Sequence, residues 1–90
     1  MNEHTTKLFD DARSNHIVEI LNDLEFDDIN INASDHNNQT LLHYAAVYNQ
    51  PTIIVKILAN FNANINALDN YHRTPLHYAS SYEHYECVRA

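Results

Sequence analysis

Apolar residues recur three or four positions apart in several short segments of this chain, a spacing typical of helices that bury one face. The first segment is predicted to begin with Thr5 or Thr6 as its N-cap and to end near Arg13. Its apolar residues share one face, which we expect to point inward: Leu8, Phe9 and Ala12. Later segments predict helices that open at Ile17 and that cover residues 41–48, 52–61 and 75–82. The pattern therefore indicates an all-helical chain.

One helix start occurs twice in the sequence. Residues 40–45 read Thr-Leu-Leu-His-Tyr-Ala, and residues 74–79 read Thr-Pro-Leu-His-Tyr-Ala. Threonine is a good N-cap because its hydroxyl accepts a hydrogen bond from a first-turn amide, and proline fits the next position because its missing N–H costs nothing there. The two copies lie 34 residues apart, from Thr40 to Thr74. A helix start that returns at a fixed interval predicts a repeat protein.

The repeated motif resembles the signature of the ankyrin repeat family, Thr-Pro-Leu-His-x-Ala with a period of about 33 residues. Residues 54–58 resemble the second, apolar helix of that repeat, and residues 62–67 (Asn-Ala-Asn-Ile-Asn-Ala) resemble its Gly-Ala-Asp-Val-Asn-Ala loop. Asp69 resembles the aspartate that opens the next hairpin. The resemblance implies an all-α solenoid of stacked helix-turn-helix units with projecting β-turn or hairpin loops, about two and a half repeats long.

The resemblance implies a single ankyrin-repeat domain, residues 1–90, which the repeat spacing divides into three units. Residues 1–33 are predicted to be a degenerate N-terminal capping repeat, residues 34–67 a repeat, and residues 68–90 a truncated repeat. A terminal unit needs a polar outer face because nothing stacks beyond it. The first unit supplies such a face with Glu3, Lys7, Asp10, Asp11 and Arg13. Because Ala90 falls partway through a predicted apolar helix, we expect this chain to be part of a longer protein.

The chain contains no glycine, although repeats of this family usually place glycine where the backbone dihedral φ is positive. Asparagine tolerates that region better than most other residues, and its side chain can close a turn. We therefore expect positive φ angles at or near four asparagines: Asn15, Asn38, Asn49 and Asn62.

Charge and cysteine content narrow the classes of partner. Twelve acidic and five basic residues give a net charge of −7, which disfavours nucleic acid and anionic membranes as partners. We find no apolar run of membrane-spanning length in the sequence. The single cysteine cannot form an internal disulfide, which fits a reducing compartment. We therefore expect an intracellular, cytoplasmic protein, and its acidity suggests a protein partner with a basic patch.

The two motif histidines, His43 and His77, are the first candidates for chemistry. A catalytic histidine needs a nucleophile and an orienting acid nearby, and the sequence shows no such set. The resemblance instead implies that this histidine hydrogen-bonds a unit to the neighbouring turn, as one member of a structural signature. The other members of that signature here are Thr40, Thr74 and Pro75. We therefore expect no enzymatic activity.

Metal sites and paired carboxylates are weaker candidates. His84 and Cys87 are three residues apart on a predicted helix, and His77 is a possible third ligand, but structural zinc prefers four ligands in closely spaced pairs. The neighbouring acids at residues 10–11 and 27–28 have no facing carboxylates or phosphate-binding loop, so we expect solvated surface. We predict no metal and no cofactor.

Tyrosines recur at the same places in two predicted helices. Tyr44 and Tyr48 are four residues apart, and Tyr78 and Tyr82 repeat that spacing in the next unit. Tyrosine is enriched at protein interfaces because it combines a large apolar area with a polar tip. We favour partner contact for Tyr48 and Tyr82, whereas for Tyr44 and Tyr78 partner contact and packing between helices remain equal alternatives. Residues on the projecting turns would extend the surface: His36, Asn37, Gln39, Tyr71 and Arg73.

These observations favour a protein-interaction scaffold that binds a partner through its concave helix face and its projecting turns. The alternative is a regulatory or substrate-docking segment of a larger enzyme whose catalytic domain lies beyond residue 90, because a fold does not determine a function.

Overall fold

The computed structural model describes residues 2–81. These residues form, in order, α1 (Glu3–Arg13), α2 (Ile17–Asp23), α3 (Leu41–Val47), α4 (Pro51–Asn60) and α5 (Pro75–Ser81). Within this part of the chain there is no β-strand, and the sole bridge joins Ser34 to Thr40 in antiparallel sense. The all-helical prediction is confirmed, and the predicted bounds of α3 and α4 agree with the structure to within one residue. The predicted start of α5 agrees as well, while its predicted end at Tyr82 lies outside the described residues.

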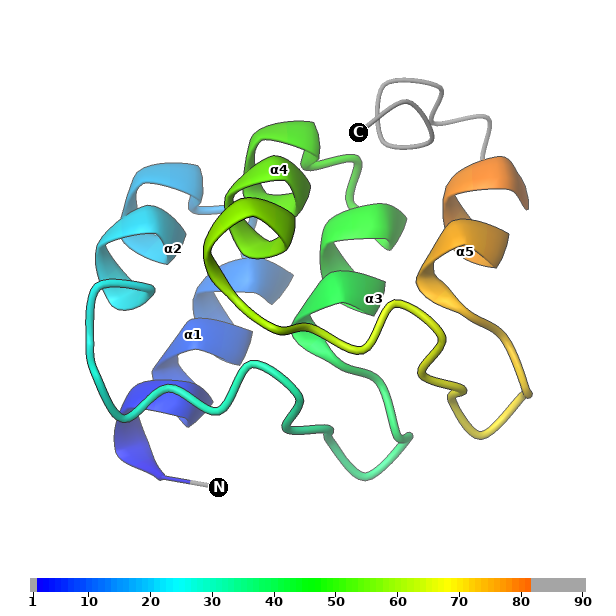
Figure 1. Ribbon diagram of the computed structural model, residues 1–90, viewed down its shortest axis with the longest axis horizontal. Coiled ribbons are helices and arrows are strands. Elements are labelled where there is room, and N and C mark those ends of the chain that lie inside the picture. Colours follow the sequence, from blue (N-terminus) through cyan, green and yellow to red (C-terminus); the bar gives the residue numbers. More distant parts are fainter. Residues whose placement is uncertain (1, 82–90) are drawn as a thin grey trace.

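The helices form two rows (Figure 1). In one row α1, α3 and α5 lie side by side, while α2 packs on α1 and α4 packs on α3 to form the second row. The two long connections, residues 24–40 and 61–74, run along the edge at which α3 and α5 begin. This arrangement is the predicted solenoid, in which each unit buries a face against its neighbour.

The helix starts follow local capping rules, with one correction. Asn2, and not Thr5 or Thr6, caps α1, because its Oδ1 accepts the Thr5 amide at 2.8 Å. Thr5 lies inside the helix and is buried, where its hydroxyl accepts the Asn30 amide at 3.5 Å. In α3, Thr40 caps as predicted, and Pro51 occupies the first turn of α4.

The core lies between the two rows and along the α1–α3–α5 row. Small residues, among them Ala12, Ala45 and Ala79, are buried where neighbouring helices approach closely. Around them lie the larger buried side chains: Leu8, Phe9, Ile20, Leu24, Leu41, Leu42, Ile53, Ile54 and Ile57. The inward face predicted for the first helix is therefore confirmed.

Positive φ angles occur at Asn15 (58°), Asn38 (59°) and Asn49 (54°), as predicted, but not at Asn62. The fourth position in the left-handed region is His72, with φ 59°. His72 lies 34 residues after Asn38, so it takes the corresponding position of the next turn. The turn geometry therefore imposes this conformation, and histidine, like asparagine, is enriched in that region.

Candidate functional site

Two projecting turns have the same internal hydrogen bonds. Asp35 Oδ1 accepts the amides of Asn37 at 2.9 Å and Gln39 at 3.0 Å. Asp69 Oδ1 accepts the amides of Tyr71 at 2.8 Å and Arg73 at 3.0 Å. Such bonds from an aspartate to amides two and four residues later hold a turn in one shape. Each aspartate therefore fixes the shape of its own turn.

A tyrosine of the following helix anchors each turn. The Tyr44 hydroxyl donates to Asp35 Oδ2, and the Tyr78 hydroxyl donates to Asp69 Oδ2. Each of these tyrosines is only 6% exposed, and the Tyr44 ring packs edge-on against Phe9. Tyr44 and Tyr78 therefore belong to the core. Of the two alternatives for these residues, packing is the one the structure supports.

The titration of these pairs keeps each tyrosine a donor and each aspartate an acceptor. Burial opposes ionisation of Asp69, but hydrogen bonds from Tyr78, the Arg73 amide and Gln39 outweigh it and lower its pKa to about 2. The pKa of Asp35 is lowered in the same way, by Tyr44 and two turn amides against the effect of burial. Burial and the neighbouring Asp35 raise the pKa of Tyr44 to about 12.

Polar side chains also link one unit to the next. Arg13 Nη2 donates to the Tyr44 hydroxyl at 3.1 Å, and its guanidinium lies 5.2 Å from the Tyr44 ring centroid. Gln39 Nε2 donates to the Tyr78 hydroxyl and to Asp69 Oδ2, both at 3.3 Å. Gln39 is half-buried and engaged in these bonds, so it serves packing between units more than contact with a partner.

The tips of the two turns are tied to each other by asparagines. The Asn70 amide N–H donates to Asn37 O at 2.9 Å, and Asn70 Nδ2 donates to His36 O at 3.2 Å. Asn38 Nδ2 donates in turn to Asn70 Oδ1 at 2.8 Å. The sequence reasoning did not single out Asn70, because the corresponding residue of the earlier turn is a histidine.

His43 joins its helix to the following turn, as the resemblance implied. Its Nδ1 accepts the Thr40 amide at 3.1 Å, which assigns the ring proton to Nε2, and Nε2 donates to Arg73 O at 2.8 Å. His43 is fully buried, and Thr40 Oγ1 accepts the His43 amide to complete a capping box.

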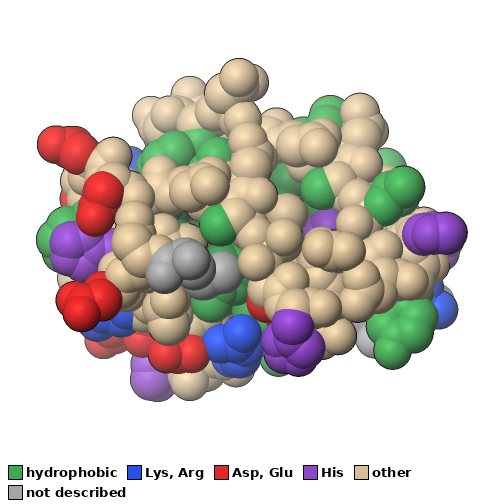
Figure 2. Space-filling view, turned by 90° about the horizontal axis from the view of Figure 1, so that it is seen from below, with side chains coloured by type: hydrophobic (Ala, Val, Ile, Leu, Met, Phe, Trp, Pro, Cys, Tyr) green, Lys and Arg blue, Asp and Glu red, His purple; other side chains and the backbone are tan. Residues whose placement is uncertain are grey.

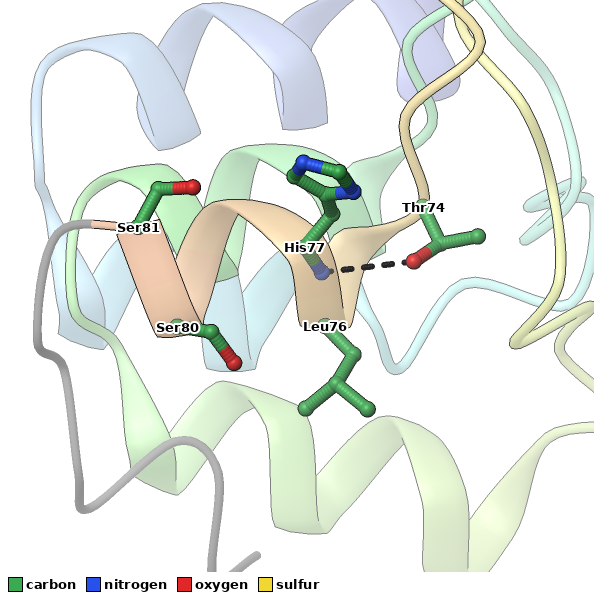
Figure 3. A pocket seen from close by; sticks show the side chains of 5 residues that line it. All are labelled: Thr74, Leu76, His77, Ser80 and Ser81. Carbon is green, nitrogen blue, oxygen red and sulfur yellow. Dashed lines mark hydrogen bonds between the residues drawn. The ribbon is translucent and has the colours of Figure 1, made fainter.

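His77 holds the same place in the motif but a different environment. Its amide donates to Thr74 Oγ1 at 3.2 Å, while its exposed ring has no hydrogen-bond partner among residues 2–81. Figure 3 shows His77 with Thr74, Leu76, Ser80 and Ser81 lining an open pocket on α5. Leu76 is 57% exposed there, whereas its counterpart Leu42 is 5% exposed. Helices α1, α4 and α5 pack on α3, whereas α3 is the one described helix that packs extensively on α5.

The remaining predicted contact residues divide by exposure. His36, Asn37 and Arg73 are exposed on the turns, and Tyr71 is 71% exposed. Tyr48, at the end of α3, is 42% exposed and meets Tyr44 edge-on. Tyr82 lies outside the described residues, as do the candidate metal ligands His84 and Cys87. The exposed contact residues on the two turns are His36, Asn37, Tyr71 and Arg73, which we call the turn-tip surface, whereas Tyr48 lies at the opposite end of α3 from the turns.

A charged cluster between α1 and α2 escaped the sequence reasoning. Lys7 Nζ lies 2.8 Å from Asp11 Oδ2 and 2.9 Å from Asp23 Oδ1. Asp23 is 3% exposed, and burial raises its pKa. Asp11 is therefore not simply solvated surface as predicted. The spacing of Lys7 and Asp11, four residues apart on one helix, was the signal available in the sequence.

Two further observations concern the described residues as a whole. No three His, Cys, Asp or Glu side chains of residues 2–81 are grouped so that they could hold a metal ion. None of the helices described in this structure is both long enough and apolar enough to cross a membrane.

Comparison with known proteins gives a family and a fold. A model of ankyrin repeats, in three copies, matches residues 8–90. A solved chain from the predatory endopeptidase Bd0816 of Bdellovibrio bacteriovorus in complex with the immunity protein Bd3460 superposes with a TM-score of 0.82 at 23% sequence identity. That alignment covers 91% of this chain but 42% of the other, so this chain spans less than half the length of its neighbour. None of the curated proteins matches.

Proposed function

Because this chain belongs to the ankyrin repeat family, we propose that it is a scaffold that binds a partner protein through its concave helix face and projecting turns. Ankyrin repeats are generally protein–protein interaction modules. The observation that carries the proposal is the internal bracing of the turns at residues 35–39 and 69–73. The Asp35 and Asp69 carboxylates hold the backbone, and the tips are bonded to each other, so binding need not order them.

The side chains presented by this rigid frame suit a protein interface. Tyr71 is the most exposed large apolar side chain of the described residues, and the Arg73 guanidinium lies 5.7 Å from its ring centroid. Tyrosine and arginine are the residue types that interfaces enrich and that most often contribute strongly to binding. An analogy adds modest support, since the solved neighbour comes from a complex between two proteins.

The distribution of charge suggests how a partner is oriented. Residues 1–33 contain eight acidic and two basic side chains, so they carry a charge of −6 out of the −7 of the whole chain. In Figure 2 the acidic side chains gather at one end of the turn-bearing face, the end that holds α1 and α2 in Figure 1. A basic patch on the partner would therefore meet the first unit, and complementary charges mainly raise the association rate.

We take residues 1–33, 34–67 and 68–90 as the units of this scaffold, supported by the offset of 34 residues between matching motifs. A cytoplasmic, intracellular location is supported by the single cysteine, because thiols of cytosolic proteins are kept reduced and rarely form disulfides.

Truncating the exposed tyrosines is expected to weaken partner binding. Affinity capture followed by titration of the captured protein would compare the wild type with Tyr48→Ala and Tyr71→Ala. We expect the affinity to fall by about tenfold or more for each variant, the effect typical of an interface residue that contributes strongly. The matched control is Val18→Ala, because Val18 is 65% exposed and its helix α2 lies in the second row, away from α3 and α5 (Figure 1). Equal affinities for all four proteins would contradict the proposal.

Changes in salt concentration and neutralised acidic residues test whether the first unit attracts a basic patch on the partner. Because exposed charges are screened over about 8–10 Å at physiological salt, the association rate is expected to fall as NaCl is raised. Glu19→Gln and Asp27→Asn remove exposed charges that have no bonded partner among the described residues, so they should lower the rate without lowering stability. Stopped-flow kinetics would measure this, and a rate independent of both salt and charge would remove the basic patch from the proposal.

A further inference from the structure

Nitrogen donors of one unit reach forward to the tyrosine–aspartate pair of the next. Arg13 Nη2 lies 3.1 Å from the Tyr44 hydroxyl and 4.0 Å from Asp35 Oδ2. Gln39 Nε2 lies 3.3 Å from both the Tyr78 hydroxyl and Asp69 Oδ2. In both places the acceptor is the same combination of a hydroxyl and a carboxylate. The molecule itself thus shows which chemistry these forward-reaching donors bind.

Arg73 stands where Gln39 stands in the preceding unit, since the two residues are 34 positions apart. Its guanidinium lies 5.7 Å from the ring centroids of both Tyr71 and Tyr78, so two aromatic rings restrict its position. Its backbone is fixed as well, because its amide donates to Asp69 and its carbonyl accepts from His43. The donor group is therefore positioned in advance.

Among the four cations of residues 2–81, Arg73 is the one without an ion pair. Lys7, Arg13 and Lys56 each form an ion pair, at 2.8, 2.8 and 3.6 Å respectively. Arg73 has no carboxylate within ion-pair distance in this part of the chain, and its side chain is exposed. The Asp69 carboxylate accepts the Tyr78 hydroxyl and the backbone amides of Tyr71 and Arg73.

We propose that Arg73, backed by Tyr71, binds a carboxylate side chain of an acidic segment on the partner protein. Arginine suits this role because its planar fork can donate two parallel hydrogen bonds to one carboxylate. The inference rests on the proposed function and names the partner chemistry at one end of that surface. The partner then presents acidic side chains to the turn of residues 69–73 and basic ones to the first unit, and these opposite charges set its direction along the stack.

Three synthetic peptides test this inference. The first is a capped hexapeptide that alternates Asp and Tyr, to imitate the acceptors found inside the molecule, and the others replace Asp by Asn or by Lys. Each is titrated into isotopically labelled protein while NMR follows the Arg73 Nε–Hε group and the Tyr71 ring. We expect the Asp peptide to shift both signals, and the Asn peptide to bind at least about tenfold more weakly, because charge-assisted hydrogen bonds are the stronger ones.

Substitutions of Arg73 test whether its guanidinium is the group that binds the Asp peptide. Arg73→Gln installs the residue found in the preceding unit and is expected to lower affinity for the Asp peptide about tenfold. Arg73→Lys keeps the charge but loses the fork, so it is expected to restore part of the affinity. Lys56→Gln is the matched control, because it removes the same charge from α4. A melting curve for each variant confirms folding.

The peptide experiments can reject the carboxylate site at Arg73 without rejecting the proposed scaffold function. Equal binding of the Asp and Asn peptides, or no effect of Arg73→Gln, would overturn it. Binding of the Lys peptide at Arg73 and Tyr71 in place of the Asp peptide would overturn it while leaving a protein-binding surface intact. If no peptide shifts any signal of the turns, the carboxylate site is rejected, and the Tyr48 and Tyr71 variants still decide the wider proposal.

Discussion

His43→Ala is expected to lower the free energy of unfolding by about 3 kcal/mol, whereas His77→Ala is expected to change it by less than about 0.5 kcal/mol. The two histidines occupy the same position of the same motif, so sequence predicts equal effects. The structure does not, because His43 is buried and bonded to Thr40 and Arg73, while the ring of His77 is exposed.

The size of the His43 effect follows from what its removal leaves behind. The Thr40 amide loses its acceptor in a buried site, at about 1–3 kcal/mol for an unsatisfied group. The Arg73 carbonyl loses the His43 bond and keeps one donor, the Asp69 amide at 3.1 Å. A cavity adds to this cost. For a domain of this size, about 3 kcal/mol corresponds to a drop in melting temperature of roughly 12–24 °C.

Urea unfolding monitored by circular dichroism would measure both histidine variants. His77→Ala serves as the control for the substitution itself. Similar losses in the two variants would mean that the ring of His77 is as well bonded as that of His43, contrary to the described contacts.

Asp69→Ala is expected to cost about 2–3 kcal/mol and to remove part of the acid sensitivity of the fold. The variant deprives the Tyr71 and Arg73 amides and the Tyr78 hydroxyl of one shared acceptor. A turn that loses this acceptor no longer holds its shape or its bond to α5. Asp27→Ala is the control, because Asp27 is exposed and has no bonded partner among residues 2–81.

The direction of the pH effect follows from the lowered pKa of Asp69. The folded state holds this pKa at about 2, below its ordinary value of 3.8, so the ionised form is stabilised by folding. Its contribution is therefore fully present above about pH 4 and is lost as the pH falls toward about 2. Acid unfolding curves would show a smaller decline over this interval for Asp69→Ala than for the wild type or Asp27→Ala. The same decline in all three would show that Asp69 does not carry the effect.

Local signals in the sequence were enough for most of the helical framework. Capping by Thr40, proline at the first turns of α4 and α5, and the apolar spacing in each segment involve residues within a turn or two of one another. The two wrong predictions, the N-cap of α1 and the fourth residue with positive φ, also have local causes. Asn2 caps α1 as well as a threonine would, and His72 takes a positive φ because the repeat places it where Asn38 stood.

The candidate surface was predicted less completely. The exposure of Tyr48, Tyr71 and Arg73 matches the sequence-based expectation, but Tyr44 and Tyr78 are buried. Helical spacing could not separate these cases, because each buried tyrosine finds its partner in an aspartate nine residues earlier, across a turn whose shape is not encoded by periodicity.

The sequence by itself determined the helices, their repeat and the family, because caps and apolar spacing act between neighbours along the chain. Only the tertiary structure decided which members of the repeated motif are buried and which are exposed. His43 is buried and bonds to the following turn at Arg73, while Leu76 and His77 are exposed. Among residues 2–81, Arg13 has a hydroxyl and a carboxylate acceptor and Arg73 has none for its side chain. The physical reason is that the burial and pairing of a side chain depend on its tertiary neighbours, which the sequence of its own segment does not specify.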